Sequence, residues 1–193
     1  MNRDEAYTLL TKYMSNKNLI KHSLAAEVTM KALYRHLTLK DDQNNLDEVK
    51  WGITGLLHDM DYEIAQKENR VEQHGMMIGI AEKESMPQDI VHGIQAHAHV
   101  YTKIMPESQM DWAITACDQL TGLIVAGALV TPDKKIGLLT TESVLKRFKE
   151  KSFAKGADRN AILLCEEKLG IPLPEFVAIT LTAMQTIADP LGL

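Results

Sequence analysis

Asp118 lies in the middle of a long apolar segment, where a carboxylate needs a partner of opposite charge. The segment from Trp112 to Val130 reads WAITACDQLTGLIVAGALV and is apolar around nearly the whole circumference of a helix, which predicts burial. No Lys or Arg lies within a helical turn of Asp118. Because an unpaired buried carboxylate is strongly destabilising, the positive charge must come from another part of the chain or from a metal ion.

A histidine and an aspartate stand side by side at the end of another apolar run, GLLHDMDYE. Carboxylates at a helix C-terminus face the negative end of the helix dipole, so Asp59 and Asp61 need another source of stabilisation. His58 and Asp59 are about 100° apart on a helix and can both turn toward one ion. His22, on a face of small residues in a third helical segment, adds a second imidazole. Together with Asp118 they form a nitrogen and oxygen donor set suited to divalent transition metals, Mg²⁺ or Mn²⁺.

Helical periodicity dominates the sequence and strand-like alternation is nearly absent, which predicts an all-α fold of about nine helices. We expect the metal site to lie between the central helices. The three helices that must position it span residues 18–37, from about 47 to 59, and from about 109 to 130.

The whole chain, residues 1–193, is predicted to form a single domain. We expect a metal-binding helical core over about 1–130 and a C-terminal helical extension over about 131–193. In the extension, Thr141 and Asp158 are predicted N-caps and Gly170 a C-cap.

The composition is that of a soluble globular protein, with 45% hydrophobic and 24% charged residues. The net charge of −5 argues against a nucleic-acid surface, and charged residues at the N-terminus argue against a signal peptide. Asp118 argues against a membrane span in the apolar segment. Cys117 and Cys165 match no zinc or CxxC spacing and are predicted to be reduced core residues, so we expect a cytoplasmic protein.

The order His22, His58-Asp59, Asp118 resembles the H…HD…D signature of the HD-domain superfamily of metal-dependent phosphohydrolases, most closely its small bacterial HDIG-type members. The resemblance spans most of the chain and is carried by LIKHSLAAE, GLLHDMDYE, EQHG, IQAHAH, DQLTGLI and KRFKEKSFAKG. It implies an all-α HD-type helical bundle in which these four residues bind a first metal ion.

Some members of this superfamily bind a second metal through two further histidines. The resemblance places His74 and His97 in those positions, with Asp59 as the bridge between the ions. Relatives often have two adjacent histidines where this chain has His97-Ala98-His99. Since His97 and His99 are about 200° apart on a regular helix, only one can point inward unless the helix end frays. The resemblance therefore leaves open whether one or two ions bind and whether His99 is a ligand.

The resemblance implies hydrolysis of phosphoester bonds by metal-activated water, with a nucleotide or a small phosphorylated metabolite as substrate. The sequence contains no P-loop and no evident Ser-His-Asp or Cys-His arrangement. Asp59 and Asp61 are the candidate catalytic carboxylates. Asp61 is interpreted as an orienting partner of a ligand histidine or as a general acid or base, and the alternative is a solvated loop aspartate. The HD pair also lacks the glycine-lysine of cyclic-dinucleotide phosphodiesterases, which argues against that activity.

Many relatives have lysine where this chain has Gln119, so cations that hold a phosphate must come from elsewhere. Lys67 and Arg70 are candidates. A basic cluster in the C-terminal third is another, and its alternative interpretation is a solvated helix face. That cluster consists of Lys146, Arg147, Lys149, Lys151, Lys155 and Arg159.

Two alternative functions remain open: a di-iron oxygenase on the same fold, or a metal-stabilised ligand-binding protein without turnover. The metal is one or two divalent ions of Fe, Mn, Zn, Co, Ni or Mg. The expected partner is a phosphorylated small molecule rather than nucleic acid or a membrane, and homo-oligomer formation is left open. His36 and His92 are predicted to be ordinary core histidines.

Overall fold

The computed structural model describes residues 1–38, 45–76 and 80–193, and these residues form helices and connecting turns without any β-strand. The predicted all-α class is therefore confirmed. Nine of the described α-helices have six residues or more, and three have four. The α-helices are α1 (Arg3–Tyr13), α2 (Lys17–Thr38), α3 (Asn45–Leu57), α4 (Tyr62–Lys67), α5 (Ile80–Lys83), α6 (Gln88–His97), α7 (His99–Thr102), α8 (Gln109–Leu129), α9 (Thr141–Lys149), α10 (Arg159–Leu169), α11 (Leu173–Gln185) and α12 (Ala188–Leu191), and the 3-10 helices are η1 (Val71–Gln73) and η2 (Ile136–Leu138).

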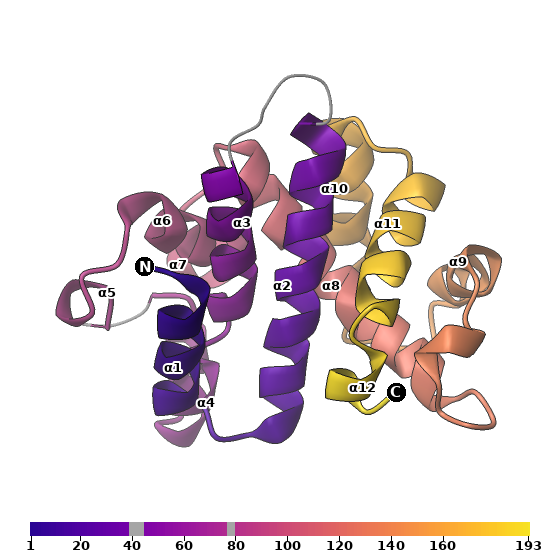
Figure 1. Ribbon diagram of the computed structural model, residues 1–193, viewed down its shortest axis with the longest axis horizontal. Helices are drawn as coiled ribbons and strands as arrows, with labels where there is room; N and C mark the ends of the chain where they lie inside the picture. Colours follow the sequence, from indigo (N-terminus) through magenta and orange to yellow (C-terminus); the bar gives the residue numbers. More distant parts are fainter. Residues whose placement is uncertain (39–44, 77–79) are drawn as a thin grey trace.

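Helix α2 runs through the centre of the molecule and packs against α3, α8 and α11 (Figure 1). Two clusters of buried apolar side chains hold this arrangement. The larger joins α2, α8, α10 and α11 and includes Leu33 and Phe176. The smaller joins α1, α3 and α6 and includes Leu10 and Leu56. Because α3 also gives Trp51 to the larger cluster, both clusters fix the helix whose end carries the HD pair.

Helices α2 and α3 approach closely because glycine faces the backbone of the neighbouring helix. A Cβ atom on Gly55 would lie 2.6 Å from the carbonyl oxygen of Ala26 and 2.9 Å from Cγ of Met30. No side chain fits such a gap without separating the helices. The close packing brings the C-terminal end of α3, with His58, next to His22 on α2.

The C-terminal third packs on the same core as the preceding helices, since Phe176 and Leu33 belong to one cluster. Asp158 accepts hydrogen bonds from the N–H groups of Asn160 and Ala161, and Gly170 ends α10 at φ +67°, which confirms both predicted caps. The prediction of Thr141 as an N-cap is wrong by one residue. Thr140 caps α9, because its hydroxyl accepts the N–H of Ser143 while Thr141 is already helical.

Helix α8 is the one helix of the described chain that is long and apolar enough to cross a membrane, but 61% of its most apolar window is buried inside the fold. This burial is typical of a core helix and is consistent with a soluble protein. Cys117 on α8 and Cys165 on α10 are both buried and unpaired, as predicted.

Glu63 on α4 fixes the turn that leads into α2. Its carboxylate accepts hydrogen bonds from the N–H groups of Ser15 and Asn16, at 2.7 and 2.9 Å, and from the Ser15 hydroxyl. The ion pair with Lys67 and these hydrogen bonds lower the pKa of Glu63 to about 2. The segment after the HD pair is thereby tied to the beginning of the helix that carries His22.

Replacing Glu63 with glutamine should lower the free energy of unfolding by about 2 kcal/mol at neutral pH, because hydrogen bonds to charged groups contribute roughly 1.5–3 kcal/mol. The pKa of Glu63 is lower in the folded protein than the unfolded value of about 4.3, so its contribution is complete above about pH 5 and is lost as the pH falls toward 2. Urea unfolding of both proteins should therefore show a smaller difference near pH 3 than at pH 7. Glu167→Gln, at a carboxylate that is 69% exposed, is the control. An equal difference at both pH values would contradict the assignment.

Candidate metal centre

Four of the predicted ligands meet where α2, α3 and α8 come together. Nε2 of His22 lies 2.8 Å from Oδ1 of Asp118 and 3.2 Å from Nε2 of His58. Nε2 of His58 lies 3.5 Å from the same Asp118 oxygen. Oδ2 of Asp59 lies 3.5 Å from Nε2 of His22 and 3.4 Å from Nε2 of His58. The structure thus brings together the residues predicted for a first metal ion.

The ring orientations in this group leave ligand nitrogens facing one another. Nδ1 of His58 donates to the carbonyl oxygen of Gly55 at 2.8 Å, since a carbonyl can only accept. Nδ1 of His22 lies 3.4 Å from the hydroxyl oxygen of Thr121, which itself donates to the carbonyl oxygen of Asp118. With both Nδ1 atoms used in this way, the two Nε2 atoms point toward the same place, where the neutral rings would offer their lone pairs to a metal ion. Such outer hydrogen bonds are typical of metal-binding histidines.

A second group of potential ligands lies on the other side of Asp59. Nε2 of His74 is 3.0 Å, and Nε2 of His97 3.6 Å, from Oδ1 of Asp59. Nδ1 of His97 donates to the carbonyl oxygen of Ile94, so its Nε2 also faces the carboxylate as an acceptor. The ligand atoms of each group, His22-His58-Asp59 and Asp59-His74-His97, lie within 4.8 Å of one another. Asp59 therefore presents one oxygen to each group.

Asp61 lies behind His74, on the side of the ring away from Asp59. Its Oδ1 accepts hydrogen bonds from Nδ1 of His74 at 2.9 Å and from the N–H of Gly75 at 3.2 Å. Asp61 is only 6% exposed, so the interpretation as a solvated loop aspartate is wrong. Its position fits that of a residue that orients a ligand histidine.

The break between α6 and α7 explains the sequence His97-Ala98-His99. Helix α6 ends at His97 and α7 begins at His99, with Ala98 buried between them. Gly75, at φ +80°, packs so closely that a Cβ atom there would lie 2.6 Å from Cβ of Ala98. Nδ1 of His99 lies 3.2 Å from the carbonyl oxygen of Ala96, and His99 belongs to neither ligand group in the described chain. Of the two histidines, His97 points to the cluster.

The ionisable side chains in this cluster strongly shift one another's pKa values. Burial disfavours the charged form of His58, but Asp59 and Asp118 outweigh it and raise the pKa of the ring to about 9. Burial is likewise outweighed by Asp59 and Asp61 at His74, whose pKa rises to about 10. Despite burial, the neighbouring histidines hold the pKa values of Asp59 and Asp118 well below their usual range. Neighbouring positive charge therefore keeps these two carboxylates ionised.

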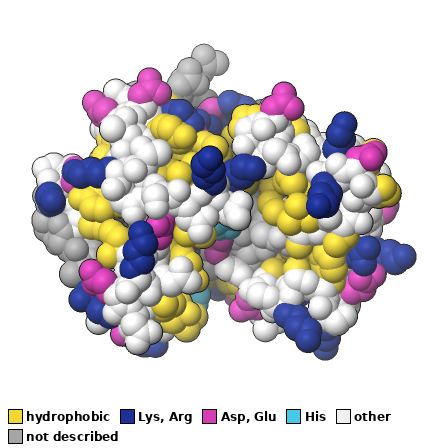
Figure 2. Space-filling view, turned by 90° about the horizontal axis from the view of Figure 1, so that it is seen from below, with side chains coloured by type: hydrophobic (Ala, Val, Ile, Leu, Met, Phe, Trp, Pro, Cys, Tyr) yellow, Lys and Arg dark blue, Asp and Glu magenta, His cyan; other side chains and the backbone are white. Residues whose placement is uncertain are grey.

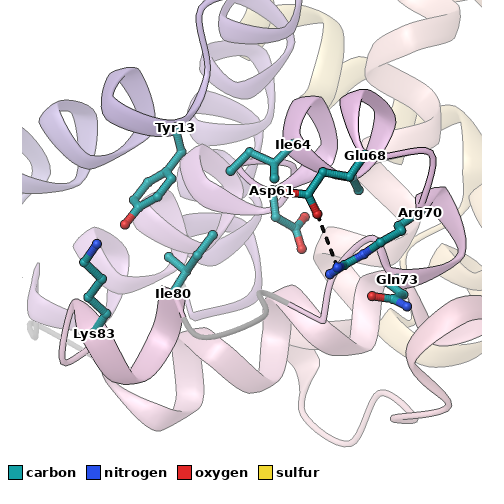
Figure 3. Close-up of a pocket in the computed structure, with 9 residues that line it drawn as sticks. Tyr13, Asp61, Ile64, Glu68, Arg70, Gln73, Ile80 and Lys83 are labelled. Atoms are coloured by element: carbon teal, nitrogen blue, oxygen red, sulfur yellow. Dashed lines mark ion pairs between the residues drawn. The ribbon is translucent and has the colours of Figure 1, made fainter.

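Lys67 and Arg70, predicted as candidates for holding a phosphate, lie outside the ligand cluster. Lys67 pairs with Glu63 at 2.8 Å and Arg70 with Glu68 at 3.3 Å. Arg70 lines a cavity of about 400 Å³ that contains none of the six predicted metal ligands (Figure 3). Asp61 lies between this cavity and His74, so Arg70 is on the far side of Asp61 from the ligand cluster.

The basic cluster of the C-terminal third is mostly structural or solvated. The guanidinium of Arg159 donates to four backbone carbonyl oxygens and is thus not available for a phosphate. Arg147 pairs with Glu150 at 2.8 Å. The four lysines of the cluster are exposed, as the solvated-face interpretation predicts. The carbonyls that receive Arg159 belong to Phe148, Phe153, Ala154 and Ala157.

The other two histidines stand apart from the cluster, but their side chains are 30% (His36) and 32% (His92) exposed, so the prediction that they are core residues is wrong. His92 pairs through Nδ1 with Oδ2 of Asp111 at 3.0 Å, and His36 lies 3.7 Å from Glu175. Sequence reasoning missed the role of Gln119. Its amide donates to Oδ2 of Asp118 at 2.6 Å and accepts the N–H of Asp158 at 3.0 Å, so it links a candidate ligand to the C-terminal third. The only sequence signal for this role was a polar residue directly after Asp118 in an apolar helix.

The cluster opens onto one face of the molecule. The side chain of His22 is 21% exposed and that of Asp118 15%, whereas His58 is fully buried. Figure 2 shows a hollow near the middle of this face, with histidine and acidic side chains inside it. A small molecule can therefore reach the cluster from the side of His22 and Asp118.

No protein-family model matches this chain, and neither a curated protein nor a solved structure does. The relation to HD domains stays a prediction from the sequence.

Proposed function

We propose that this chain is an HD-type phosphohydrolase that uses two divalent metal ions. The observation that carries the proposal is the position of Asp59, whose two oxygens face two separate groups of histidine nitrogens. A carboxylate placed in this way is suited to bridge two ions. One ion would be held by His22, His58, Asp59 and Asp118, and the other by Asp59, His74 and His97.

The donor set fits divalent transition metals. Four imidazole nitrogens and two carboxylates match the preferences of Mn²⁺, Fe²⁺, Co²⁺, Ni²⁺ or Zn²⁺, and the nitrogens make Mg²⁺ a weaker match. The Nδ1 atoms of His58 and His97 are held by backbone carbonyls, and that of His74 by Asp61, so that each Nε2 atom is directed inward. Cys117 is buried, and its hydrogen-bond partner is the carbonyl of Ile114, so no thiolate joins the set.

When bound, such ions lower the pKa of water and neutralise phosphoryl oxygens, which is the chemistry that phosphoester hydrolysis requires. The protein contributes the geometry. Asp61 fixes the ring of His74, and Gln119 fixes the carboxylate of Asp118. His22 and Asp118 form the exposed edge, where a substrate phosphate arrives. The buried side, at His58 and His97, excludes bulk water from the cluster.

The protein should bind two metal ions per chain and hydrolyse phosphate monoesters only when they are present. Elemental analysis after gel filtration measures the first, and release of inorganic phosphate with Mn²⁺, Fe²⁺, Co²⁺, Zn²⁺ or Mg²⁺ measures the second. A chelator should abolish the activity and lower the melting temperature, because an ion that binds only the folded state stabilises it. An unchanged melting curve after verified removal of metal would contradict a metal site in this cluster.

The same experiment separates the alternatives. Four histidines and two carboxylates also suit a pair of iron ions, so oxygen consumption by the iron-loaded protein, without phosphate release, would favour a di-iron oxygenase. Stable metal binding without either reaction would favour a metal-stabilised binding protein. Phosphate release that depends on metal but not on oxygen supports the phosphohydrolase, which we place in the cytoplasm.

A further inference from the structure

Two cavities adjoin the candidate metal centre and meet at His22 and Gly122. The first, of about 290 Å³, lies between α8 and the loop after α9 and also reaches Asp118 and Gln119. The second, of about 470 Å³, extends from the same point along α8 to the C-terminal turn. Its volume alone lies within the range of roughly 300–1,000 Å³ found for small-molecule sites. We call the two cavities together the Gly122 cleft.

Gly122 forms the floor of this cleft, one helical turn after Asp118. Glycine is the least favourable residue in a helix interior after proline, yet Gly122 lies in the middle of α8. A Cβ atom there would meet nothing within 4 Å apart from the backbone of its own helix. Packing within the protein therefore does not require glycine at this position. The open space above it is the cleft itself, directly beside the cluster.

The wall of the first cavity is a rigid loop. Arg159 holds it by donating to the carbonyl oxygens of Ala154 and Ala157, at 2.6 and 2.7 Å. Ala154 adopts φ +42°, a conformation that is unfavourable for a residue with a side chain and persists only where the surroundings impose it. The link from Asp158 to Gln119 joins this loop to α8. The cavity is thus held open on both sides by fixed structure.

The second cavity is mainly apolar. Val125 and Leu129 line it from α8, and Leu191 lines it from α12. Leu129 is 49% exposed, which is a large exposed fraction for a leucine beside a cavity. Lys21 also lines this cavity, and its Nζ atom lies against Gly192 at the C-terminal turn. The cleft therefore runs from the polar ligand cluster at His22 to apolar side chains along α8.

We propose that the Gly122 cleft binds the organic group of the substrate and that this group is apolar, such as an alkyl chain or an aromatic ring. This inference rests on the proposed phosphohydrolase function, which places the phosphate at His22 and Asp118. The organic group then passes over Gly122, where no side chain blocks it, and contacts Val125 and Leu129. Along α8 the second cavity offers a polar group such as a nucleoside no side-chain hydrogen bond, because Gly122, Val125 and Leu129 line it there.

Alkylphosphonates provide a test by direct binding, since their carbon-phosphorus bond resists hydrolysis. Calorimetry with the metal-loaded protein should show tighter binding along the series from methyl- to hexylphosphonate. The expected gain is about threefold to fourfold in affinity for each methylene, the value for burial of one such group. Equal affinities across the series, or tighter binding of a nucleoside 5′-monophosphate than of hexylphosphonate, would overturn the proposal.

Gly122→Leu fills the cleft without touching the metal ligands. In this variant all phosphonates should bind about as weakly as methylphosphonate does to the wild type, so the dependence on chain length disappears. Metal content should be unchanged, and the melting temperature should not fall, because leucine favours helix and meets open space. Gly137→Leu is the matched control, at an exposed glycine that also meets nothing within 4 Å and lies outside the cleft.

The outcomes distinguish this inference from the proposed function. If phosphonate binding depends on chain length and on Gly122 but no phosphate monoester is hydrolysed, the proposed function fails and the cleft assignment stands. If monoesters are hydrolysed while Gly122→Leu keeps the full chain-length dependence, the organic group lies elsewhere and the cleft assignment fails.

Discussion

Asp59→Ala is expected to lose both metal ions and essentially all phosphohydrolase activity. Its two oxygens lie between the two histidine groups, within 3.6 Å of four Nε2 atoms. Removing this carboxylate would take one ligand from each of the two proposed ions and leave the four imidazoles without their shared negative charge. Since metal ions contribute several kcal/mol of transition-state stabilisation, the rate should fall on the order of 10³-fold or more. Elemental analysis and phosphate release, measured on the same preparation, test both parts.

The control for this substitution is His36→Ala. His36 pairs with Glu175 on α11 and has no contact with the cluster, so its removal should leave metal content and rate unchanged. An Asp59→Ala protein that still holds two ions per chain would contradict the bridging role, whatever its activity.

Asp118 and the HD pair could be predicted as one cluster because their chemistry is visible in the sequence. A carboxylate inside an apolar helix without a nearby cation must find a partner, and adjacent histidine and aspartate at a helix end give one. His22 was predicted as a ligand because small residues share its helix face, and small residues allow two helices to pack closely. The structure confirms that approach at Gly55, whose missing side chain lets α3 contact the backbone at Ala26.

Other parts of the site could not be predicted because they depend on how loops and turns fold. Arg159 looked like a free cation, but four carbonyls of a folded loop converge on it. For Asp61 the sequence left an orienting partner, a general acid or base and a solvated loop residue open, and the turn after α3 decides by placing it against His74. The position of Ala98 between two histidines has a reason only once Gly75 packs against it. A sequence pattern predicts which face of a helix is buried, but it does not predict where the carbonyl groups of a loop converge on one side chain.

The prediction of Thr141 as an N-cap failed for a local reason. Two threonines precede α9, and either hydroxyl can accept a backbone N–H from the first turn. Thr140 takes this role because the Ser143 hydroxyl accepts its own N–H in return, a reciprocal arrangement that Thr141 does not form. Element type was therefore more reliable than the exact boundary.

His74→Ala and His97→Ala should each reduce the metal content from two ions per chain to one. Both rings face Oδ1 of Asp59, on the opposite side from His22 and His58, so the first ion keeps its ligands. Activity should fall far more than stability, because in a two-metal site the ions together stabilise the attacking and leaving oxygens. Elemental analysis, phosphate release and thermal unfolding of each variant measure the three quantities.

His99→Ala is the matched comparison for His97→Ala. The two histidines flank Ala98, but only His97 belongs to a ligand group, so the His99 variant should keep both ions and most of its activity. If His74 and His97 were ordinary core histidines, the pattern would be reversed, with stability falling and metal content unchanged. A wild-type protein that holds only one ion per chain under saturating metal would also exclude the two-metal site, since Asp59 would then have a single ion to bind.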